Sequence, residues 1–162
     1  MDYQVHKTAI VDSGAEIGVG TKVWHWVHIC SGAKIGSNVT LGQNVFVGNQ
    51  VSIGNDCKIQ GSVYISDKTI IGNNVFIGPG SVITNDKYPP SGGDWSPVNV
   101  ENDVIIGGNC TIIAGVILSQ GCVIGAGSVV TKNIPSNEVW AGNPATFMMS
   151  RDVYEYRRES HE

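Results

Sequence analysis

Aliphatic residues stand at every sixth position along the first half of the chain. The series runs unbroken from Val5 to Ile83 and has 14 members. A small or β-branched residue follows four positions later, as at Ala9 and Ala15. Glycine often stands directly after the aliphatic residue, where a turn favours a residue without a Cβ. The chain is therefore built on a hexapeptide repeat.

The six-residue spacing predicts short strands. The small residue of one repeat and the aliphatic residue of the next are two positions apart, so both side chains point to the same side of a strand. The residue between them points outward. One such unit cannot bury its apolar face, so we expect the repeats to coil on one another as a parallel β-helix. A helix would need apolar residues three and four positions apart, which this stretch lacks.

Three repeats per coil would stack residues that are 18 positions apart. The outward residues then form three columns along the solenoid, and two of these columns are largely compatible with solvent. The third column reads Ile10, His28, Phe46, Tyr64 and Val82. Because an exposed aromatic stripe of this length is typical of a binding surface, we expect this face to form a subunit interface.

The repeat loses its register after Ile83 and resumes at Val100, one residue out of phase. The intervening residues 84–97 are rich in turn formers and cannot continue the coil. We predict an extruded loop over about residues 84–99, in which Tyr88 and Trp95 form a lid or cleft wall beside the aromatic face.

The repeat also defines the domain organisation. Residues 1–135 form the predicted β-helix domain. Residues 136–162 form a predicted capping tail, with a short helix over about residues 148–159, because a β-helix needs a capped end to prevent edge-to-edge growth.

Composition and charge narrow the functional classes. Charged residues are 15% of the 162 residues, against about 25% in typical proteins, which indicates that other subunits cover part of the surface. A net charge of -4 without a Lys/Arg run argues against nucleic acid or an anionic membrane as partner. The chain opens without the features of a signal peptide, and no stretch approaches 18 apolar residues, so we expect a cytoplasmic protein.

The four cysteines predict little chemistry. Cys57, Cys110 and Cys122 fall on the small inward position, where a thiol acts as a compact apolar side chain, and Cys30 falls in a turn. Because the chain has no Cys-x-x-Cys pair, we expect no metal and no redox use of these thiols.

The repeats, the loop and the ending over residues 124–132 and 142–145 resemble the hexapeptide-repeat acyltransferases, which fold as left-handed parallel β-helices. Within that family, residues 24–29, 42–48 and 84–85 are similar to enzymes that acetylate amino groups on nucleotide-linked 3-amino sugars. The resemblance implies a homotrimer that binds acetyl-CoA along the groove between neighbouring coils. It covers nearly the whole chain.

The resemblance also implies residues that contact the coenzyme. Gly108, Ala126, Thr131 and Lys132 match positions at which such enzymes touch it, mostly through backbone groups. Lys132 could pair with a phosphate, or it could be an ordinary solvated lysine. Relatives often carry a basic residue at the position of Thr146, so the partner of the coenzyme phosphates is open, with Arg151 as a weak substitute.

The loop indicates an amine acceptor. Relatives that acetylate hydroxyls commonly have a catalytic histidine before the loop proline, where this chain has Tyr88. An amine can attack a thioester without a base, whereas a sugar hydroxyl cannot do so readily. The resemblance assigns to Asn85 the task of orienting the amine, with the departing CoA thiolate as the acceptor of the proton.

Further candidates surround this chemistry. His28 is a candidate base or acceptor ligand, or a structural histidine at an interface. The expected substrate-binding residues are His25, Trp26, Asn44, Tyr64 and Tyr88. Interface packing is the alternative for the Trp-His-Trp turn at residues 24–26.

The predicted function is acetyl-CoA-dependent N-acetylation of a UDP- or dTDP-linked amino sugar for surface polysaccharide synthesis, without a metal. An O-acetyltransferase of the same fold is one alternative. A γ-type carbonic anhydrase would need three histidines on zinc, and only His25 and His28, with His6 a coil away, come into question. A non-catalytic β-helix scaffold is the third alternative.

Overall fold

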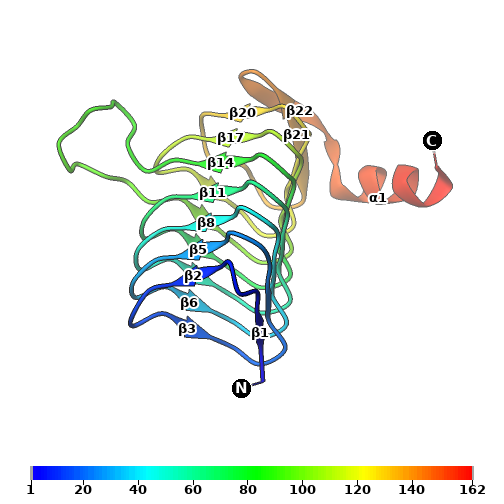
Figure 1. The fold of residues 1–162 in the computed structure, drawn as a ribbon. Helices are drawn as coiled ribbons and strands as arrows, with labels where there is room; N and C mark the ends of the chain where they lie inside the picture. Colours follow the sequence, from blue (N-terminus) through cyan, green and yellow to red (C-terminus); the bar gives the residue numbers. More distant parts are fainter. Residues whose placement is uncertain (1, 162) are drawn as a thin grey trace.

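The chain winds into a three-sided parallel solenoid, which Figure 1 shows from the side. This computed structural model describes residues 2–161. Three sheets form the sides, and we name them sheets A, B and C in the order in which the chain visits them. The predicted all-β fold, a left-handed parallel β-helix with an extruded loop and a short C-terminal helix, is confirmed.

Sheet A contains β1 (Gln4–Val5), β4 (Lys22–Val23), β7 (Thr40–Leu41), β10 (Lys58–Ile59), β13 (Phe76–Ile77), β16 (Ile105–Ile106), β19 (Val123–Ile124), β21 (Glu138–Gly142) and β22 (Ala145–Ser150). Sheet B contains β2 (Ile10–Val11), β5 (His28–Ile29), β8 (Phe46–Val47), β11 (Tyr64–Ile65), β14 (Val82–Ile83), β17 (Thr111–Ile112) and β20 (Val129–Val130). Sheet C contains β3 (Glu16–Ile17), β6 (Lys34–Ile35), β9 (Ser52–Ile53), β12 (Ile70–Ile71), β15 (Asn99–Val100) and β18 (Ile117–Leu118).

Two of the corners between these sheets matter for function. Corner AB leads from sheet A to sheet B and consists of residues 6–9, 24–27, 42–45, 60–63, 78–81, 107–110 and 125–128. Corner BC leads from sheet B to sheet C and consists of residues 12–15, 30–33, 48–51, 66–69, 84–98, 113–116 and 131–133. Sheet B therefore lies between the two corners.

The strands stack in the predicted register. Phe46 pairs with His28 on one side and with Tyr64 on the other, each 18 positions away. The spacing rises to 29 positions where Val82 pairs with Thr111, because the extruded loop lies between them. The loop occupies residues 84–98, as predicted.

The inward side chains form one continuous core. Ile29 and Ile59 are fully buried, and burial of such a side chain stabilises the fold by roughly 1.5–3 kcal/mol. Cys57, Cys110 and Cys122 are buried free thiols in this core, as the repeat predicts.

The end of the chain differs from the prediction. The short helix begins later than expected, because β22 extends to Ser150 and α1 spans Arg151–Ser160. The Ser150 side chain accepts a hydrogen bond from the Val153 amide and so caps the start of the helix. The antiparallel hairpin of β21 and β22, which extends sheet A, is an element that the repeat does not predict.

The helix α1 projects away from the solenoid (Figure 1). It has no buried residue, and the Arg151 guanidinium at its start donates to the carbonyl oxygens of Asp103 and Gly121 at 3.2 and 2.9 Å. This helix, the only one in residues 2–161, is too short and too polar to cross a membrane.

Candidate active site at two corners of the solenoid

A groove of about 570 Å³ runs along corner AB. Its lining includes Trp24, Gln43, Gly61, Pro79 and Asn109, which belong to five successive coils. Because neighbouring strands are about 4.8 Å apart, the groove extends about 19 Å along the solenoid. It can therefore hold an extended ligand, but not a ligand that must be enclosed.

Two of the predicted coenzyme residues lie at the upper end of this corner. The Gly108 carbonyl accepts a hydrogen bond from the Gly127 amide at 2.8 Å, which stacks the turns that carry Gly108 and Ala126. A Cβ added at the adjacent Gly107 would lie 2.5 Å from the backbone nitrogen of Ala126. The close stacking of the coils therefore requires glycine at position 107, and it leaves the backbone of this corner open to a ligand.

The other two predicted coenzyme residues lie elsewhere. Thr131 and Lys132 belong to corner BC in the last coil, across sheet B from Gly108. The Lys132 ammonium lies 4.9 Å from the centroid of the Trp140 ring, in cation–π contact, above the end of the core. Within one chain, the four residues therefore do not form one cluster.

The Trp-His-Trp turn lies at the lower end of corner AB. The ring of His25 stacks on that of His6 with 3.6 Å between the centroids, and the Asn44 amide donates to the His25 carbonyl at 2.9 Å. Trp26 is 63% exposed and has a φ of 55°, a conformation that large side chains rarely adopt. His25, Trp26 and Asn44, three of the predicted substrate residues, are thus neighbours beside the groove.

The pKa of His6 is lowered in this stack of rings. Partial burial, followed by the proximity of His25 and of Lys7, lowers the pKa of His6 below its ordinary value. The imidazole of His6 is also within 2.9 Å of the Thr8 hydroxyl. The neutral form of His6 is therefore favoured in the folded chain.

The predicted aromatic column covers the outer face of sheet B. The rings of Phe46 and Tyr64 stack with 4.9 Å between centroids, and His28 meets Phe46 edge-on at 5.6 Å. Tyr64 is exposed, so this face presents an aromatic surface between the two corners. Its role as a subunit interface stays a prediction.

The extruded loop leaves the solenoid at corner BC and projects to the side away from β21 and α1 (Figure 1). The Ser96 amide donates to the Asn85 carbonyl at 2.7 Å and closes the base of the loop. Asn85 is half-buried at this base, whereas Tyr88 is 80% exposed near the tip. The loop does not fold over its own solenoid as a lid in this structure.

Asp86 is a candidate that the sequence did not single out. One oxygen of its carboxylate accepts a hydrogen bond from the Ser91 amide at 3.0 Å. The other oxygen, Oδ1, is buried and has no hydrogen-bond partner within residues 2–161. A buried carboxylate oxygen without a partner is costly, so a ligand N–H beside Asn85 would stabilise it.

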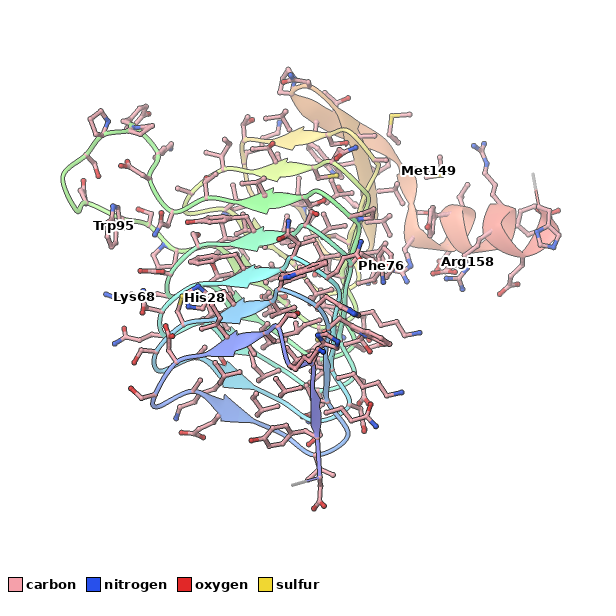
Figure 2. The ribbon with its side chains drawn as sticks, in the orientation of Figure 1. His28, Lys68, Phe76, Trp95, Met149 and Arg158 are labelled. Atoms are coloured by element: carbon pink, nitrogen blue, oxygen red, sulfur yellow. The ribbon has the colours of Figure 1, made fainter. Side chains whose placement is uncertain are left out.

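His28 lies on β5, three strands away from the β14 strand that leads into Asn85. At the spacing of neighbouring strands this is about 14 Å, too far for joint action within one chain. Figure 2 shows His28 and Trp95 toward the same side of the solenoid but at different heights, with Phe76 of sheet A toward the other side. The imidazole instead meets Asp12, with Nε2 3.1 Å from Oδ2.

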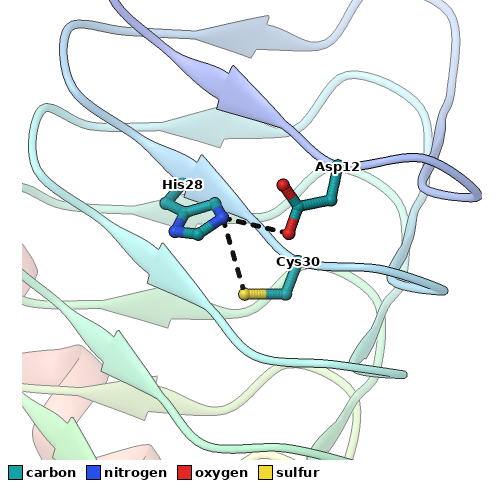
Figure 3. A group of neighbouring side chains, drawn as sticks. All are labelled: Asp12, His28 and Cys30. Atoms are coloured by element: carbon teal, nitrogen blue, oxygen red, sulfur yellow. Dashed lines mark hydrogen bonds and ion pairs between the residues drawn. The ribbon is translucent and has the colours of Figure 1, made fainter.

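Cys30 completes a small group with these two side chains (Figure 3). Its Sγ lies 3.9 Å from His28 Nε2, and burial followed by the negative charge of Asp12 raises the pKa of the thiol. A spacing of 18 residues between Asp12 and Cys30 was the signal for this group in the sequence. In the part of the chain that the structure describes, three histidines do not converge on one point as a carbonic anhydrase would require.

The candidate residues therefore fall into two sets. Corner AB holds the groove, the coenzyme-type glycine turns and the aromatic turn. Corner BC holds Asn85 and Asp86. Because sheet B separates the corners, one chain alone does not unite the groove with the loop.

Comparison with known proteins identifies the family. The profile of the bacterial transferase hexapeptide, which describes six repeats, matches residues 14–49 and 50–85. The profile of the hexapeptide repeat of succinyl-transferase matches residues 97–132. The chain belongs to the hexapeptide-repeat transferase family. The gap between the two sets of matches coincides with the extruded loop of this chain.

One curated relative is an N-acetyltransferase. The chain is 51% identical over 76 residues to a 2,3,4,5-tetrahydropyridine-2,6-dicarboxylate N-acetyltransferase of Halalkalibacterium halodurans. The match covers 47% of this chain and 30% of that relative, so the chain spans about a third of the length of the curated protein that it matches.

Similar solved structures include complexes with the coenzyme. A hexapeptide-repeat acetyltransferase of Vibrio cholerae, solved with acetyl coenzyme A, is 28% identical, with a TM-score of 0.55 and coverage of 68% of this chain and 69% of that one. A maltose O-acetyltransferase of Clostridium difficile is 29% identical, with a TM-score of 0.60 and coverage of 69% and 66%. A Caulobacter crescentus protein in complex with CoA and GDP-perosamine shares the fold at 22% identity, with a TM-score of 0.52 and coverage of 89% and 56%.

Proposed function

We propose that this transferase moves the acetyl group of acetyl-CoA to the amino group of a UDP- or dTDP-linked amino sugar, with a 3-amino sugar as the favoured acceptor. The product would serve the synthesis of a surface polysaccharide or glycan. The observation that carries the proposal is the base of the loop, where Asn85 stands beside Asp86 and its unpartnered carboxylate oxygen, without a histidine in residues 84–98.

The groove at corner AB supports acetyl-CoA as the donor. An open groove of about 19 Å, flanked by the small residues Gly108 and Ala126, suits the extended pantetheine arm of the coenzyme. The acetyl-CoA complex of the Vibrio cholerae relative supports the same donor. Thr131 and Lys132 would contact the coenzyme from the end of the solenoid. The Lys132 ammonium would then leave its cation–π contact with Trp140 and pair with a phosphate of the coenzyme.

The separation of the corners supports a homotrimer. In a ring of three copies, corner BC of one protomer faces corner AB of the next, and the aromatic column of sheet B lies between them. The loop of one copy would then bring Asn85, Asp86 and Tyr88 to the groove of its neighbour. His25, Trp26, Asn44 and Tyr64 would line the acceptor side.

In the proposed reaction, the side chains at the base of the loop orient the acceptor amine. The Asn85 amide orients the attacking amine, and Asp86 Oδ1 accepts an N–H of that amine. The nitrogen attacks the thioester carbonyl, the C–N bond forms and the C–S bond breaks. The amine proton passes to the departing thiolate, so the products are an amide and CoA. Positioning supplies most of the rate enhancement in this scheme.

His28 has a weaker place in the proposal. Its predicted role as a base requires that a second copy bring it to the loop, because about 14 Å separates it from Asn85 in its own chain. In the scheme above, the amine needs no side-chain base.

An O-acetyltransferase is the second candidate function, and the 29% identity to the maltose O-acetyltransferase favours it. The loop distinguishes the two, because a hydroxyl acceptor needs a base to remove its proton during attack. In this loop Asp86 is the carboxylate that lies next to Asn85 and could act in that way, whereas Asp94 lies in the exposed part of the loop.

A thiol-release assay tests the proposal. The purified chain is incubated with acetyl-CoA and UDP- or dTDP-linked 3-amino sugars, each paired with the sugar that carries a hydroxyl in place of the amine. Maltose and an amino dicarboxylate complete the panel. We expect CoA release with an amino sugar and none with its hydroxyl partner. Turnover of the hydroxyl sugar or of maltose would overturn the proposal in favour of O-acetylation.

A further inference from the structure

We propose that Asp12, His28 and Cys30 form a binding site for one divalent transition-metal ion, with zinc as the ion that it takes in the cell (Figure 3). The site lies where the first two coils meet at corner BC. The inference is independent of the acetyl transfer proposed above.

The coil geometry brings the three side chains together. Ile10 pairs with His28 in register, so Asp12 and Cys30, each two residues further along, occupy the same corner position on successive coils. His28 and Cys30 are two residues apart in an extended segment, so their side chains point to the same side. The ligands therefore come from two coils that the sheet holds at a fixed spacing.

The distances suit a tetrahedral ion. His28 Nε2 lies 3.1 Å from Asp12 Oδ2 and 3.9 Å from Cys30 Sγ, and all three donor atoms lie within 4.8 Å of one another. Zinc binds nitrogen, oxygen and sulfur at about 2.0–2.3 Å, so ligand atoms at tetrahedral angles lie about 3.3–3.6 Å apart. The observed distances bracket this range, and small side-chain rotations would complete the site.

The donor set selects the kind of ion. A carboxylate and a thiolate balance the two charges of the ion, and the imidazole binds as a neutral ligand. Thiolate and imidazole favour zinc or cobalt over magnesium or calcium, which prefer oxygen ligands. In a single chain the Asp12 and His28 side chains are 40% and 37% exposed, which leaves room for an ion to enter and for a fourth ligand.

The same three residues do not form a nucleophilic relay. In a Cys-His-Asp relay, the carboxylate accepts a hydrogen bond from one imidazole nitrogen while the thiol meets the other. Here both Asp12 and Cys30 approach the same atom, Nε2 of His28. Convergence on one point is the arrangement that a shared ion requires. Phe46 holds the imidazole ring edge-on and fixes its direction.

The position suggests a structural task for the ion. The first coil is the end of the solenoid, so no further coil covers its inward side chains. Its Val5 and Val11 are each 39% exposed. An ion held jointly by Asp12 of this coil and by Cys30 of the next would tie the open end of the solenoid to the body. We expect zinc to raise the melting temperature of the full chain.

Metal titration tests the site. The purified chain is stripped with a chelator and titrated with zinc chloride and with cobalt(II) chloride. We expect one equivalent of either ion per chain, a higher melting temperature with zinc, and a thiolate-to-cobalt charge-transfer absorption. Binding of less than one equivalent, or a cobalt spectrum without the thiolate band, would overturn the proposal.

Variants locate the ion. We expect Cys30→Ser to abolish the charge-transfer band and Asp12→Asn to weaken zinc binding by about tenfold or more. The matched control is Cys57→Ser. Cys57 Sγ donates a hydrogen bond to the Gly72 carbonyl, and the Thr21 hydroxyl donates an equivalent bond to the Gly36 carbonyl in another coil. A serine hydroxyl at position 57 should therefore find the same partner. Circular dichroism confirms that each variant folds. An unchanged band in Cys30→Ser, or its loss in Cys57→Ser, would place the ion elsewhere and refute the site.

Discussion

Corner AB and corner BC arise from the same six-residue repeat, yet they have become different surfaces. Corner AB keeps tight turns in every coil, so it presents a continuous groove with a backbone that a ligand can approach. Corner BC is interrupted by residues 84–98, which place Asn85 and Asp86 at the base of a projecting loop. The inward positions of the repeat thus determine the fold, while the turn positions are free to carry chemistry.

The difference has a functional consequence. A groove without reactive side chains can hold a donor, and a loop with an amide and a carboxylate can orient an acceptor. Because sheet B separates them within one chain, we infer that the two corners meet between copies. Variants at each corner should therefore affect different kinetic constants.

The largest effect should come from Asn85 at corner BC. We expect Asn85→Ala to lower kcat by about 100-fold or more, because loss of orientation alone can have an effect of this size. The thiol-release assay measures it, and sedimentation checks that the oligomer persists. Unchanged kinetics would remove Asn85 from the mechanism.

Asp86 should follow. We expect Asp86→Asn to lower kcat by about 10- to 100-fold, since a hydrogen bond to a charged group contributes about 1.5–3 kcal/mol. The matched control is Asp94→Asn in the exposed part of the same loop, which should leave kcat within about twofold. Equal losses in both variants would point to a general effect of loop charge.

Corner AB should respond in the binding of the donor. Gly108 is half-exposed, and a Cβ there would lie 3.3 Å from the Pro79 carbonyl oxygen, so a larger side chain fits only by projecting outward. We expect Gly108→Phe to raise the KM for acetyl-CoA by about tenfold, equivalent to about 1.4 kcal/mol, with little change in kcat. Ala126→Gly, which only removes a methyl group, serves as the control. A fall in kcat without a rise in KM would contradict the division of tasks between the corners.

The smallest effect concerns the histidine stack at the lower end of corner AB. The pKa of His6 is lowered in the folded chain, so the unfolded chain, with a pKa of about 6.5 for this group, binds protons more readily. The stability that neutral His6 contributes is therefore present above pH 6.5 and is lost as the pH falls from that value through the lower pKa of the folded chain. We expect a slightly smaller fall in melting temperature between pH 7.5 and pH 5.5 for His6→Gln than for the parent chain. An identical fall would exclude this role.

The fold could be predicted in detail over the part of the chain that follows the hexapeptide repeat. The aliphatic residues of the repeat, such as Ile29 and Ile59, predict the strand positions, the 18-residue register and the site of the loop. These side chains are fully buried, so the six-residue spacing has to be kept for all of them to reach the core. The hairpin of β21 and β22 could not be predicted in this way, because it caps the solenoid and does not repeat. The helix is expected to begin at about residue 148, but it begins at Arg151 because Ser150 caps it. This cap is a local signal that the apolar pattern does not contain.

The candidate site was less accessible to prediction. Single residues such as Asn85 and Gly108 could be proposed, but their separation across sheet B follows only from the three-dimensional coil. Asp86 was missed because the partner of its carboxylate, the Ser91 amide, depends on the path of a loop without a repeat. Asp12 and Cys30 stand 18 positions apart, but they lie in a corner, where the sequence pattern does not show which way a side chain points.

Mixing two impaired variants tests the central claim most directly. Asn85→Ala copies carry an intact groove and Gly108→Phe copies carry an intact loop, so in a ring of three an intact loop faces an intact groove at some interfaces. After subunit exchange of equal amounts, we predict recovery to about a quarter of the parent activity at low acetyl-CoA, since random mixing pairs the intact parts at one interface in about four. Activity no higher than the average of the two variants, with exchange verified by mass spectrometry, would show that the corners do not meet between copies.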